Sequence, residues 1–522
     1  MKTLFEKLLD YYHINKEEYE HLTRPVSLSD IPSPSLFKDM DKAVELVKKH
    51  VQNNDKIVIY GDYDVDGITG CSILIKALKL IGFSANYYIP NRYLDGYGIN
   101  NEKAKEIIDK KYNLVITVDN GISANEPIKL LRENGIDVLV IDHHERQEIL
   151  PDANVIIHPN VSGYSTLASS GAFTAYMFSK ALLGRDDKYL STLAGISLIS
   201  DMMPLKDFNR DFLRSVISSY QKGEFLAIDL LLDDTDFDDV SIGMSIAPKL
   251  NAVGRLDKTI NINRLVKYLT SDNKEEILNY KYWINSINNE RKEKTKDAKS
   301  EIIDNLKDYK GKSLVVVCDV EEGLLGLIAN QLMNTLKIPV IVFTHADKEP
   351  NILKGSGRSI EGFNLAQSFV ALKDLLDTYG GHALAAGISL KEENFEKFKL
   401  KFAEIVENTP LEKPKKEYLD LSINEINMES LNLIRSFSPF GEGWKSPLLR
   451  IRHIKTDSLM YSKTKEHVMT TIGYNTRILA FNHPKEEMDQ YSFVDMIGSL
   501  RLSSFGNNQY VEFVASEIEE SN

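Results

Sequence analysis

Short apolar runs alternate with amphipathic stretches through the part of the chain that follows residue 50. Four of these runs are apolar at nearly every position: KIVIYG (56–61), NLVITV (113–118), DVLVI (137–141) and NVIIH (154–158). Helical patterns such as GCSILIKALKLIG lie between the first three runs. Strands that are apolar on both faces and alternate with helices are typical of a parallel sheet covered by helices. We therefore predict an α/β domain over residues 51–268, mainly helical from residue 165 onward.

Changes in this pattern divide the rest of the chain. Residues 275–306 are charged and lack proline and glycine, which predicts one long helix that bridges two lobes. A second α/β pattern begins at SLVVVC (313–318), and a linker marked by proline and lysine occupies residues 409–418. Beyond it, short strand patterns predict a small barrel or sandwich. The predicted parts are an N-terminal segment that ends in a helix (1–50), the first α/β domain (51–268), a connecting helix (269–308), a second α/β domain (309–408) and a C-terminal β domain (418–522).

Composition limits the class of protein. The 522 residues are 43% hydrophobic and 27% charged, as is typical of a globular protein with several domains. The sequence has a polar N-terminus and no apolar run of membrane-spanning length, so we expect a cytoplasmic protein without a membrane partner. The two cysteines, Cys71 and Cys318, predict neither a disulfide framework nor a cysteine-based zinc site. The net charge of −13 is weak evidence against a nucleic-acid partner, because a local basic groove or a bridging metal is enough for binding.

Acids and histidines follow the predicted strands. The first strand is followed, in GDYDVDG, by Asp62, Asp64 and Asp66, and the second, in VDNG, by Asp119. The third strand is followed, in IDHHE, by Asp142, His143 and His144. A further acid, Asp201, interrupts an apolar helical pattern in LISDMMPL. Any one of these acids is more often a helix cap or a turn residue. The carboxyl ends of parallel strands form one edge of the sheet, however, so their recurrence favours a shared site. Carboxylate and imidazole donors without thiolate favour Mn²⁺ or Mg²⁺ over zinc or iron, and so many carboxylates predict two ions.

The motifs YGDYDVDGITG, VDNG, DHH and SDMMPL, in this order, resemble the four motifs of the DHH phosphoesterase family. Four downstream segments are similar to the single-strand-specific exonucleases of that family: APKLNAVGRLD (247–257), GSGRSIEGFNL (355–365), YGGHALAAGISL (379–390) and PFGEGWKSPL (439–448). The resemblance covers nearly the whole chain from about residue 25. It implies an α/β fold with a parallel-sheet DHH phosphoesterase domain, a long connecting helix, a second α/β DHH-associated domain and a C-terminal OB-like β-barrel.

The resemblance also implies roles for the acids and histidines. One ion would be held by Asp62, Asp64 and Asp119, and the second by Asp66, Asp119, His143 and Asp201, with Asp119 bridging the two. Asp142 would orient a histidine, and His144 would face the scissile phosphate or its leaving oxygen. The predicted catalytic residues are therefore Asp119, Asp142 and His144.

The glycine-rich segments of the second α/β domain are compatible with anion binding. In GSGRSIEG, glycine lets the backbone approach an anion, to which Ser356 and Arg358 can donate hydrogen bonds, although glycine alone more often marks a turn. The resemblance makes Arg92, Ser356 and Arg358 candidates for a pocket that grips a 5′-phosphate, and Asn251, Arg255 and His382 candidates for holding the strand near the scissile bond. Aromatic residues of the C-terminal domain either stack on bases or fill its core; they include Tyr461, Tyr474, Phe481 and Tyr510.

Two segments depart from the family pattern. Lys249 stands where the family usually has arginine, which keeps the charge but loses the bidentate geometry of a guanidinium. The segment CDVEEGLLGLIANQL lacks the aromatic–histidine pair that often precedes its glycines in the family. Neither departure removes a predicted metal ligand.

The predicted activity is that of a single-stranded-DNA-specific 5′-to-3′ exonuclease that releases 5′-mononucleotides by two-metal phosphodiester hydrolysis, in DNA recombination and repair. Single-stranded DNA is then the substrate, a single-strand-binding protein or a helicase is a candidate partner, and a monomer is compatible with the sequence. Two alternatives stay open: a DHH-family phosphodiesterase for short oligonucleotides or cyclic dinucleotides, and a non-catalytic DNA-binding scaffold. The C-terminal barrel argues against the first alternative, and the complete set of carboxylates argues against the second.

Overall fold

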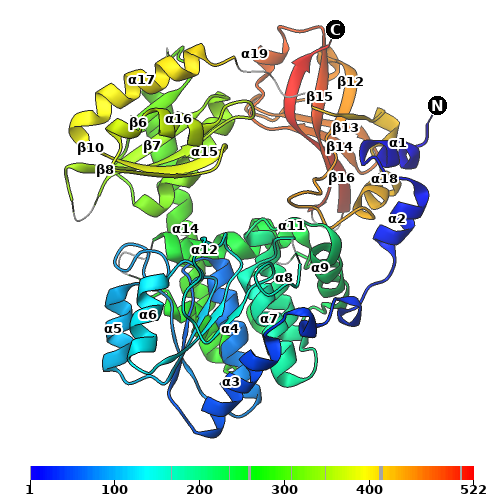
Figure 1. Ribbon diagram of the computed structural model, residues 1–522. Helices are drawn as coiled ribbons and strands as arrows, with labels where there is room; N and C mark the ends of the chain where they lie inside the picture. The colour runs from blue at the N-terminus through cyan, green and yellow to red at the C-terminus, as the bar shows by residue number, and fades with distance from the viewer. Residues whose placement is uncertain are drawn as a thin grey trace. The chain divides into compact units, whose positions relative to one another are not determined.

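The computed structural model describes residues 2–165, 167–233, 235–256, 260–306, 309–346, 349–410, 416–505 and 508–521. These residues form two compact units, coloured along the chain in Figure 1. The larger unit contains residues 32–201 and 220–414, and the smaller unit contains residues 1–31, 202–219 and 415–522.

The larger unit contains a five-stranded sheet in the order β2-β1-β3-β4-β5, with every pair of neighbours parallel. The strands are β1 (Ile57–Tyr60), β2 (Asn86–Tyr88), β3 (Leu114–Val118), β4 (Asp137–Ile141) and β5 (Val155–Ile157). All residues of β1 and β3 are buried, as strands covered by helices on both faces require. The sequence pattern predicts four of these strands but not β2, whose three residues are too short a run to stand out.

Helices surround this sheet: α3 (Met40–Gln52), α4 (Val65–Leu80), α5 (Asn101–Asp109), α6 (Asn125–Glu133), α7 (Gly171–Leu183), α8 (Lys188–Ser200), α10 (Leu226–Asp229), α11 (Asp239–Ser241), α12 (Ala247–Arg255) and α13 (Asn263–Thr270). A π-helical turn, Ile242–Ile246, leads into α12. Helices α7 and α8 pack against each other and against α4. This packing positions the end of α8 close to the start of α4, although the two helices are far apart in the sequence.

A long helix, α14 (Lys274–Asp304), connects this sheet to a second one (Figure 1). It contacts α12 and α13 in one part of the unit and α15 (Glu322–Leu336) in the other. The second sheet has the order β6-β7-β8-β10-β9, in which only β6 and β7 are parallel. Its strands are β6 (Leu314–Val317), β7 (Val340–His345), β8 (Ile352–Arg358), β9 (Thr378–Gly381) and β10 (Ala385–Lys391), and its other helices are α16 (Leu365–Ala371) and α17 (Phe395–Asn408).

The smaller unit is a six-stranded sheet in the order β11-β12-β15-β16-β14-β13 with five helices. Its strands are β11 (Leu419–Asp420), β12 (Leu449–Lys455), β13 (Val468–Gly473), β14 (Thr476–Ala480), β15 (Phe493–Phe505) and β16 (Asn508–Glu520). Its helices are α1 (Leu4–Tyr11), α2 (Lys16–Thr23), α9 (Asp207–Ser219), α18 (Met428–Arg435) and α19 (Lys485–Met488). Leu4 and Leu8 belong to the core of this sheet, so the N-terminal helix α1 packs on the C-terminal strands.

Short 3₁₀ turns complete the chain at Leu28–Asp30, Pro34–Leu36, Lys373–Leu375, Glu392–Asn394, Ile423–Glu425 and Thr456–Ser458. The predicted fold class is confirmed in its parallel sheet, its long connecting helix, its second α/β part and its strand-rich C-terminal part. The predicted domain boundaries stay predictions; residues 307–308 of the connecting segment and 411–415 of the linker lie outside the described residues.

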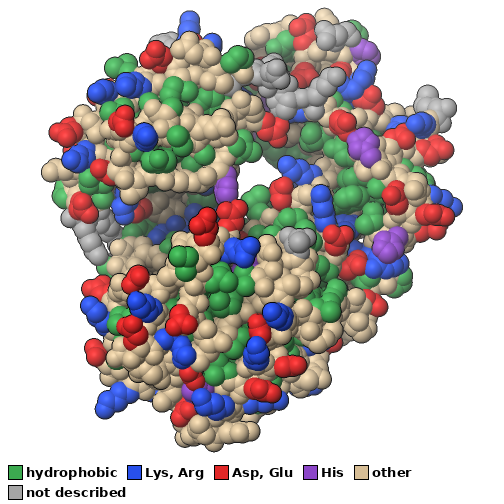
Figure 2. All heavy atoms as spheres, viewed as in Figure 1, with side chains coloured by type: hydrophobic (Ala, Val, Ile, Leu, Met, Phe, Trp, Pro, Cys, Tyr) green, Lys and Arg blue, Asp and Glu red, His purple; other side chains and the backbone are tan. Residues whose placement is uncertain are grey.

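Two further features concern the apolar character of the helices and the distribution of charge. In the described part of the chain, no helix combines the length and the apolar character needed to cross a membrane. On the face shown in Figure 2, acidic and basic side chains are intermixed. The negative net charge is therefore not gathered into one exposed patch on that face.

Arg210 anchors α9 within the smaller unit. Its side chain is buried and donates hydrogen bonds to the carbonyl oxygens of Phe437 (2.8 Å), Ser438 (3.1 Å) and Pro439 (2.8 Å). The guanidinium carbon also lies 4.9 Å from the ring centroid of Trp444. The loop before β12 is thereby fixed on α9, because three of its carbonyl groups depend on a single guanidinium.

We expect Arg210→Met to destabilise the smaller unit. Methionine fills part of the same volume, but the buried carbonyl groups lose their donor, so the free energy of unfolding should fall by about 3 kcal/mol. Urea unfolding followed by tryptophan fluorescence measures the change. Arg435→Met, at an exposed position of α18, is the matched control. Equal midpoints for the two variants would contradict the anchoring role.

Candidate metal centre and anion pocket

The ends of three parallel strands bring acids to one edge of the first sheet. Strands β1, β3 and β4 lie side by side in parallel register. The residues that follow them therefore meet at the carboxyl edge, where open α/β sheets bind ligands. Asp62 follows β1, Asp119 follows β3 and Asp142 follows β4, and all three side chains are buried.

The segment GDYDVDG turns directly from β1 into α4. Asp64 is the N-cap of α4, and its Oδ1 accepts hydrogen bonds from the backbone N–H groups of Asp66 (2.9 Å) and Gly67 (3.1 Å). Position 67 requires glycine, because a Cβ atom there would lie 2.4–2.6 Å from backbone atoms of Asp62. The first turn of α4 therefore packs directly against the end of β1, which keeps Asp62, Asp64 and Asp66 close together.

Asp66 is held by two further helices. Its carboxylate accepts hydrogen bonds from the N–H groups of Gly171 and Ala172, both at 2.7 Å, in the first turn of α7. The hydroxyl of Ser197, on α8, donates a third hydrogen bond at 2.5 Å. The first turn of a helix has free N–H donors, which suits a buried carboxylate. Asp66 therefore fixes α4, α7 and α8 relative to one another at the sheet edge.

His143 lies at the centre of the acids. Its Nε2 atom is 3.1 Å from Oδ1 of Asp119, 3.4 Å from Oδ2 of Asp66 and 3.5 Å from Oδ2 of Asp201. Asp201 caps the C-terminal end of α8. One imidazole nitrogen is thus close to carboxylates from three separate segments.

Asp142 and His144 form a second pair beside this centre. Oδ1 of Asp142 lies 2.8 Å from Nδ1 of His144, and its Oδ2 accepts a hydrogen bond from the N–H of Ile122 (2.9 Å). Burial opposes the charged imidazole, yet the hydrogen bond and charge of Asp142 raise the pKa of His144 to about 9. The hydroxyl of Tyr97 is 3.1 Å from Nε2 of His144. Asp142 therefore orients His144, with its protonated Nδ1 toward the carboxylate.

Three sets of ligand atoms lie close enough together to bind a metal ion: Asp62, Asp64 and Asp119; Asp66, His143 and Asp201; and Asp119, His143 and His144. Within each set, all the atoms lie within 4.8 Å of one another. Two buried carboxylate oxygens, Oδ1 of Asp62 and Oδ2 of Asp201, have no hydrogen-bond partner in the described structure. Hard oxygen donors with a few imidazoles and no thiolate fit Mn²⁺ or Mg²⁺. The first two sets correspond to the two predicted ion sites, and metal binding itself stays a prediction.

The electrostatics of the metal-free centre favour the binding of a cation. Burial, followed by the charge of Asp64, raises the pKa of Asp62 to about 8. Burial, followed by the charge of Asp66, raises the pKa of Asp201 to about 8 and that of Asp119 well above its usual value. Like charges in a buried site resist ionisation unless an opposite charge compensates them. A bound divalent cation would supply that charge.

A basic pocket of about 770 Å³ lies in the same unit. Its lining includes Arg92, Arg255, Ser356 and Arg358, which come from both α/β parts. Among the described residues, none of these three arginines forms an ion pair with a carboxylate. Burial, followed by the charge of Arg92, lowers the pKa of Arg255 to about 10. Unpaired guanidinium groups beside a serine hydroxyl are suited to a phosphate group.

Three residues singled out from the sequence lie elsewhere or serve another purpose. Asn251 is half-buried on α12 and His382 is exposed between β9 and β10; neither side chain forms a hydrogen bond within the described structure or lines the basic pocket. Lys249 is buried, and its Nζ donates to the carbonyl oxygen of Leu231 (2.6 Å) and pairs with Asp233 (2.6 Å). The lysine therefore fastens α12 to a neighbouring loop, for which a single ammonium is sufficient.

Three polar residues that support the centre are not predicted from the sequence. Tyr97 contacts His144, and its place in the GYG of PNRYLDGYG was the one available signal. Ser197 contacts Asp66 from the middle of an apolar helix. His158 accepts hydrogen bonds at Nδ1 from two backbone N–H groups, which leaves Nε2 to donate to the carbonyl oxygen of His144 (2.9 Å). No sequence motif marks the last two.

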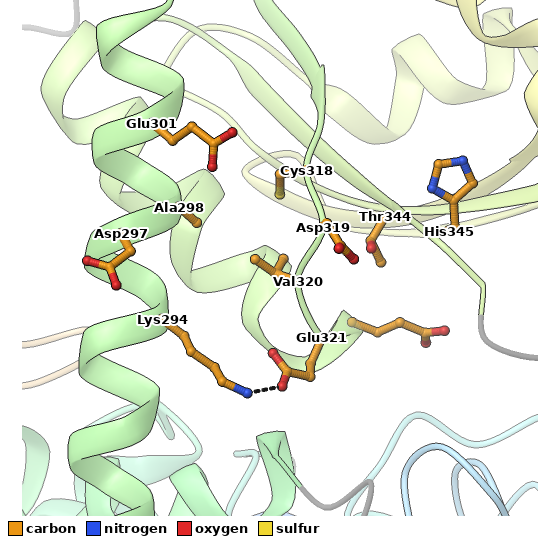
Figure 3. Close-up of a pocket in the computed structure, with 11 residues that line it drawn as sticks. Lys294, Asp297, Ala298, Glu301, Cys318, Asp319, Val320, Glu321, Thr344 and His345 are labelled. Carbon is orange, nitrogen blue, oxygen red and sulfur yellow. Dashed lines mark hydrogen bonds and ion pairs between the residues drawn. The ribbon is translucent and has the colours of Figure 1, made fainter.

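A separate pocket of about 470 Å³ between α14 and residues 318–322, which follow β6, is acidic (Figure 3). Carboxylates of Asp297, Glu301 and Asp319 line it, and Lys294 forms an ion pair with Glu321 at its edge. The sets of potential metal ligands found among the described residues all lie at the sheet edge, and none of them lies in this pocket. This pocket is unsuited to a phosphate group.

The four aromatic residues named in the C-terminal domain differ in exposure. Tyr474 is 94% exposed in the turn between β13 and β14, and Phe481 is 45% exposed. Arg477 covers the ring of Tyr510 at 3.4 Å from its centroid, and Tyr461 packs against the core. Tyr474 and Phe481 are thus accessible to a base, whereas Tyr461 serves mainly the core.

Sequence models of three families match the chain. The N-terminal domain of the DHH family matches residues 56–200, the DHHA1 domain matches residues 310–408 and the RecJ OB domain matches residues 419–517. The first match contains the carboxylates and histidines of the sheet edge except Asp201, which lies one residue beyond it, and the second contains Ser356 and Arg358. The OB-like identity predicted for the C-terminal barrel is therefore confirmed.

Two curated relatives and one solved structure are similar over most of the chain. The single-stranded-DNA-specific exonuclease RecJ of Bacillus subtilis (strain 168) is 31% identical over 502 residues, covering 92% of this chain and 63% of the relative. Its namesake in Escherichia coli (strain K12) is 30% identical over 457 residues, covering 78% of this chain and 77% of the relative. A crystal structure of RecJ in complex with Mn²⁺ from Thermus thermophilus shares the fold, with a TM-score of 0.83 at 23% identity over 99% of this chain and 76% of that chain. The chain belongs to the DHH family and, within it, to the RecJ group.

Proposed function

We propose that the protein is a metal-dependent exonuclease that degrades single-stranded DNA from the 5′ end and releases 5′-mononucleotides. The observation that carries the proposal is the presence, in one compact unit, of a buried carboxylate–imidazole centre and a pocket of unpaired arginines. A 5′-directed enzyme needs both features, because it must hold the terminal phosphate while it cleaves the next phosphodiester. The similarity to relatives named single-stranded-DNA-specific exonucleases supports this choice of substrate.

Two ions, Mn²⁺ or Mg²⁺, would be held at the sheet edge. Asp62, Asp64 and Asp119 would hold one, and Asp66, His143 and Asp201 would hold the other together with Asp119. Such a pair of ions, when bound, activates a water molecule and stabilises the oxygens of a phosphoryl displacement. The hydrogen bonds to Asp66 from α7 and α8 would keep its ligand atom aimed at the centre.

His144 would act on the phosphate itself. Oδ1 of Asp142 accepts a hydrogen bond from the protonated Nδ1 of His144 and so directs Nε2 outward, next to the hydroxyl of Tyr97. An imidazolium held charged by Asp142 can donate a hydrogen bond to a phosphate oxygen or a proton to the departing 3′ oxygen. The pKa of about 9 keeps that proton in place at neutral pH.

The 5′ end would be gripped by Arg92, Ser356 and Arg358, with Arg255 beside them. Asn251 and His382 remain proposed contacts of the strand near the scissile bond. The OB domain would guide the strand by stacking bases on exposed aromatic rings such as that of Tyr474. Such an enzyme would act in DNA recombination and repair in the cytoplasm, and a single-strand-binding protein or a helicase would deliver the strand.

The small-substrate alternative and the scaffold alternative have less support. A DHH phosphodiesterase for dinucleotides has no need of an OB domain, which this chain contains. A scaffold has no need of buried carboxylate and imidazole groups with the spacing of metal ligands. Comparing turnover of a dinucleotide with that of a long oligonucleotide separates the small-substrate enzyme from the exonuclease.

The polarity of digestion tests the proposed function directly. We expect a single strand labelled at its 5′ end to release a labelled mononucleotide at once, whereas a 3′-labelled strand shortens progressively. A duplex of the same sequence should resist digestion. Gel electrophoresis of timed samples in Mn²⁺ and in Mg²⁺ measures both. Immediate release of the 3′ label, or equal digestion of the duplex, would contradict the proposal.

Replacing Asp119 tests the shared ligand. We expect Asp119→Asn to lower kcat by a factor of about 1,000 or more in either metal, because one carboxylate would serve both ions. Asp152→Asn, at an exposed position of the same unit, is the matched control and should retain full activity. Circular dichroism should give the same folded spectrum for both variants. Activity of Asp119→Asn close to that of the control would refute the bridging role.

The raised carboxyl pKa values predict how pH affects stability and metal binding. Asp62 and Asp201 titrate near pH 8 in the metal-free protein but near pH 4 when unfolded. Between these values the folded state binds more protons, so metal-free stability should fall as pH rises from about 4 to about 8. Metal binding should release protons, and the increase in Tm produced by Mn²⁺ should be larger at about pH 8.5 than at about pH 6. Calorimetry in buffers of different ionisation enthalpy measures the protons released; none released at pH 7 would contradict the prediction.

A further inference from the structure

The hydroxyl of Tyr93 joins the two α/β parts of the larger unit. It donates a hydrogen bond to the carbonyl oxygen of Arg255, the last residue of α12, at 2.5 Å. It accepts a second one from the N–H of Gly323, in the first turn of α15, at 3.2 Å. Nη1 of Arg255 donates in turn to the carbonyl oxygen of Gly323 at 3.1 Å. A single phenol therefore ties the end of one helix to the start of another.

The two helices meet backbone to backbone at this point. A Cβ atom at position 323 would lie 2.3 Å from the carbonyl oxygen of Arg255 and 2.8 Å from its Cα. No side chain at position 323 could therefore bridge the two backbones. Tyr93 supplies the donor that Arg255 needs and the acceptor that Gly323 needs, from a third segment.

The groups that Tyr93 holds belong to the basic pocket. Arg255 and Gly323 both line it, and so does Arg92, the neighbour of Tyr93 in the sequence. The side chain of Arg92 lies over the ring of Tyr63, with its guanidinium carbon 4.2 Å from the ring centroid. A guanidinium binds phosphate through a planar fork of donors, so its fit is sensitive to small movements of the backbone that carries it.

We propose that Tyr93 is a positioning residue for the 5′-phosphate: its hydroxyl holds the backbone of Arg255 and the first turn of α15 in the arrangement that binds a terminal phosphate. The inference deepens the proposed function and rests on its assignment of the basic pocket. Within the described residues, Tyr93 forms no hydrogen bond or ion pair with any of the proposed metal ligands. Loss of its hydroxyl should therefore weaken recognition of the 5′ end and spare the hydrolytic step.

The experiment compares Tyr93→Phe, which removes only the hydroxyl, with Tyr189→Phe. Tyr189 donates a comparable hydrogen bond to the carbonyl oxygen of Leu269 (2.6 Å) and lies outside the basic pocket. Each variant is assayed on the same single strand bearing either a 5′-phosphate or a 5′-hydroxyl group. The readouts are KM and kcat with Mn²⁺, and Kd from fluorescence anisotropy in EDTA.

For Tyr93→Phe we expect KM and Kd for the phosphorylated strand to rise by about tenfold, the effect of one lost hydrogen bond. Its kcat, and all values for the 5′-hydroxyl strand, should stay within about twofold of wild type. Tyr189→Phe should match wild type on both strands, since Tyr189 is not among the residues that line the basic pocket.

Three results would overturn the inference. The first is an equal change in KM and Kd on both strands, which marks a purely structural role. The second is no change in KM or Kd in Tyr93→Phe. The third is a wild-type protein that binds the 5′-phosphate and 5′-hydroxyl strands equally. Failure of the proposed function gives a different result. In that case the wild type would bind the 5′-phosphate strand more tightly than the 5′-hydroxyl strand, and Tyr93→Phe would lose this preference. Neither strand would be hydrolysed.

Discussion

Carboxylates crowd together away from water at one edge of the first sheet, and several elements of the larger unit are arranged around them. Asp62, Asp66 and Asp119 are buried, and each lies among other acids at the edge of the first sheet. Burial and mutual repulsion oppose the ionisation of these acids, and a bound cation would offset that cost. The fold maintains this arrangement because the acids are fixed by backbone geometry, and because a divalent cation can convert the repulsion into attraction.

The surrounding elements hold the side chains of that centre in position. Helix α7 offers its first N–H groups to Asp66, α8 adds the hydroxyl of Ser197 and places Asp201, and Asp142 fixes His144. The basic pocket provides the opposite charge within the same compact unit, where α12 and α15 meet. A strand that binds with its 5′-phosphate among the arginines would present its next phosphodiester to the acids. The separation of charge within the unit, more than any single residue, would then set the direction of the proposed substrate.

Much of the centre could be predicted from the sequence, because strands that are apolar on both faces show where the sheet ends and which acids follow. The partners of those acids could not. Ser197 lies 131 residues from Asp66 and has no polar neighbours that would mark it. The buried position of Lys249 depends on the carbonyl group of Leu231, which no side-chain pattern reveals. The assignment of α9 to the smaller unit likewise depends on Arg210 and three distant carbonyl groups. Contacts of this kind arise from tertiary packing, whereas strand ends are encoded locally.

The proposed hydrolysis depends on two cations that would share Asp119 at the sheet edge. Anomalous diffraction at the manganese edge, from crystals grown with Mn²⁺, tests it most directly. We expect two peaks about 3.5–4 Å apart, both within bonding distance of the Asp119 carboxylate. One flanks Asp62 and Asp64, and the other flanks Asp66, His143 and Asp201. A single peak, or two peaks of which only one contacts Asp119, would contradict it.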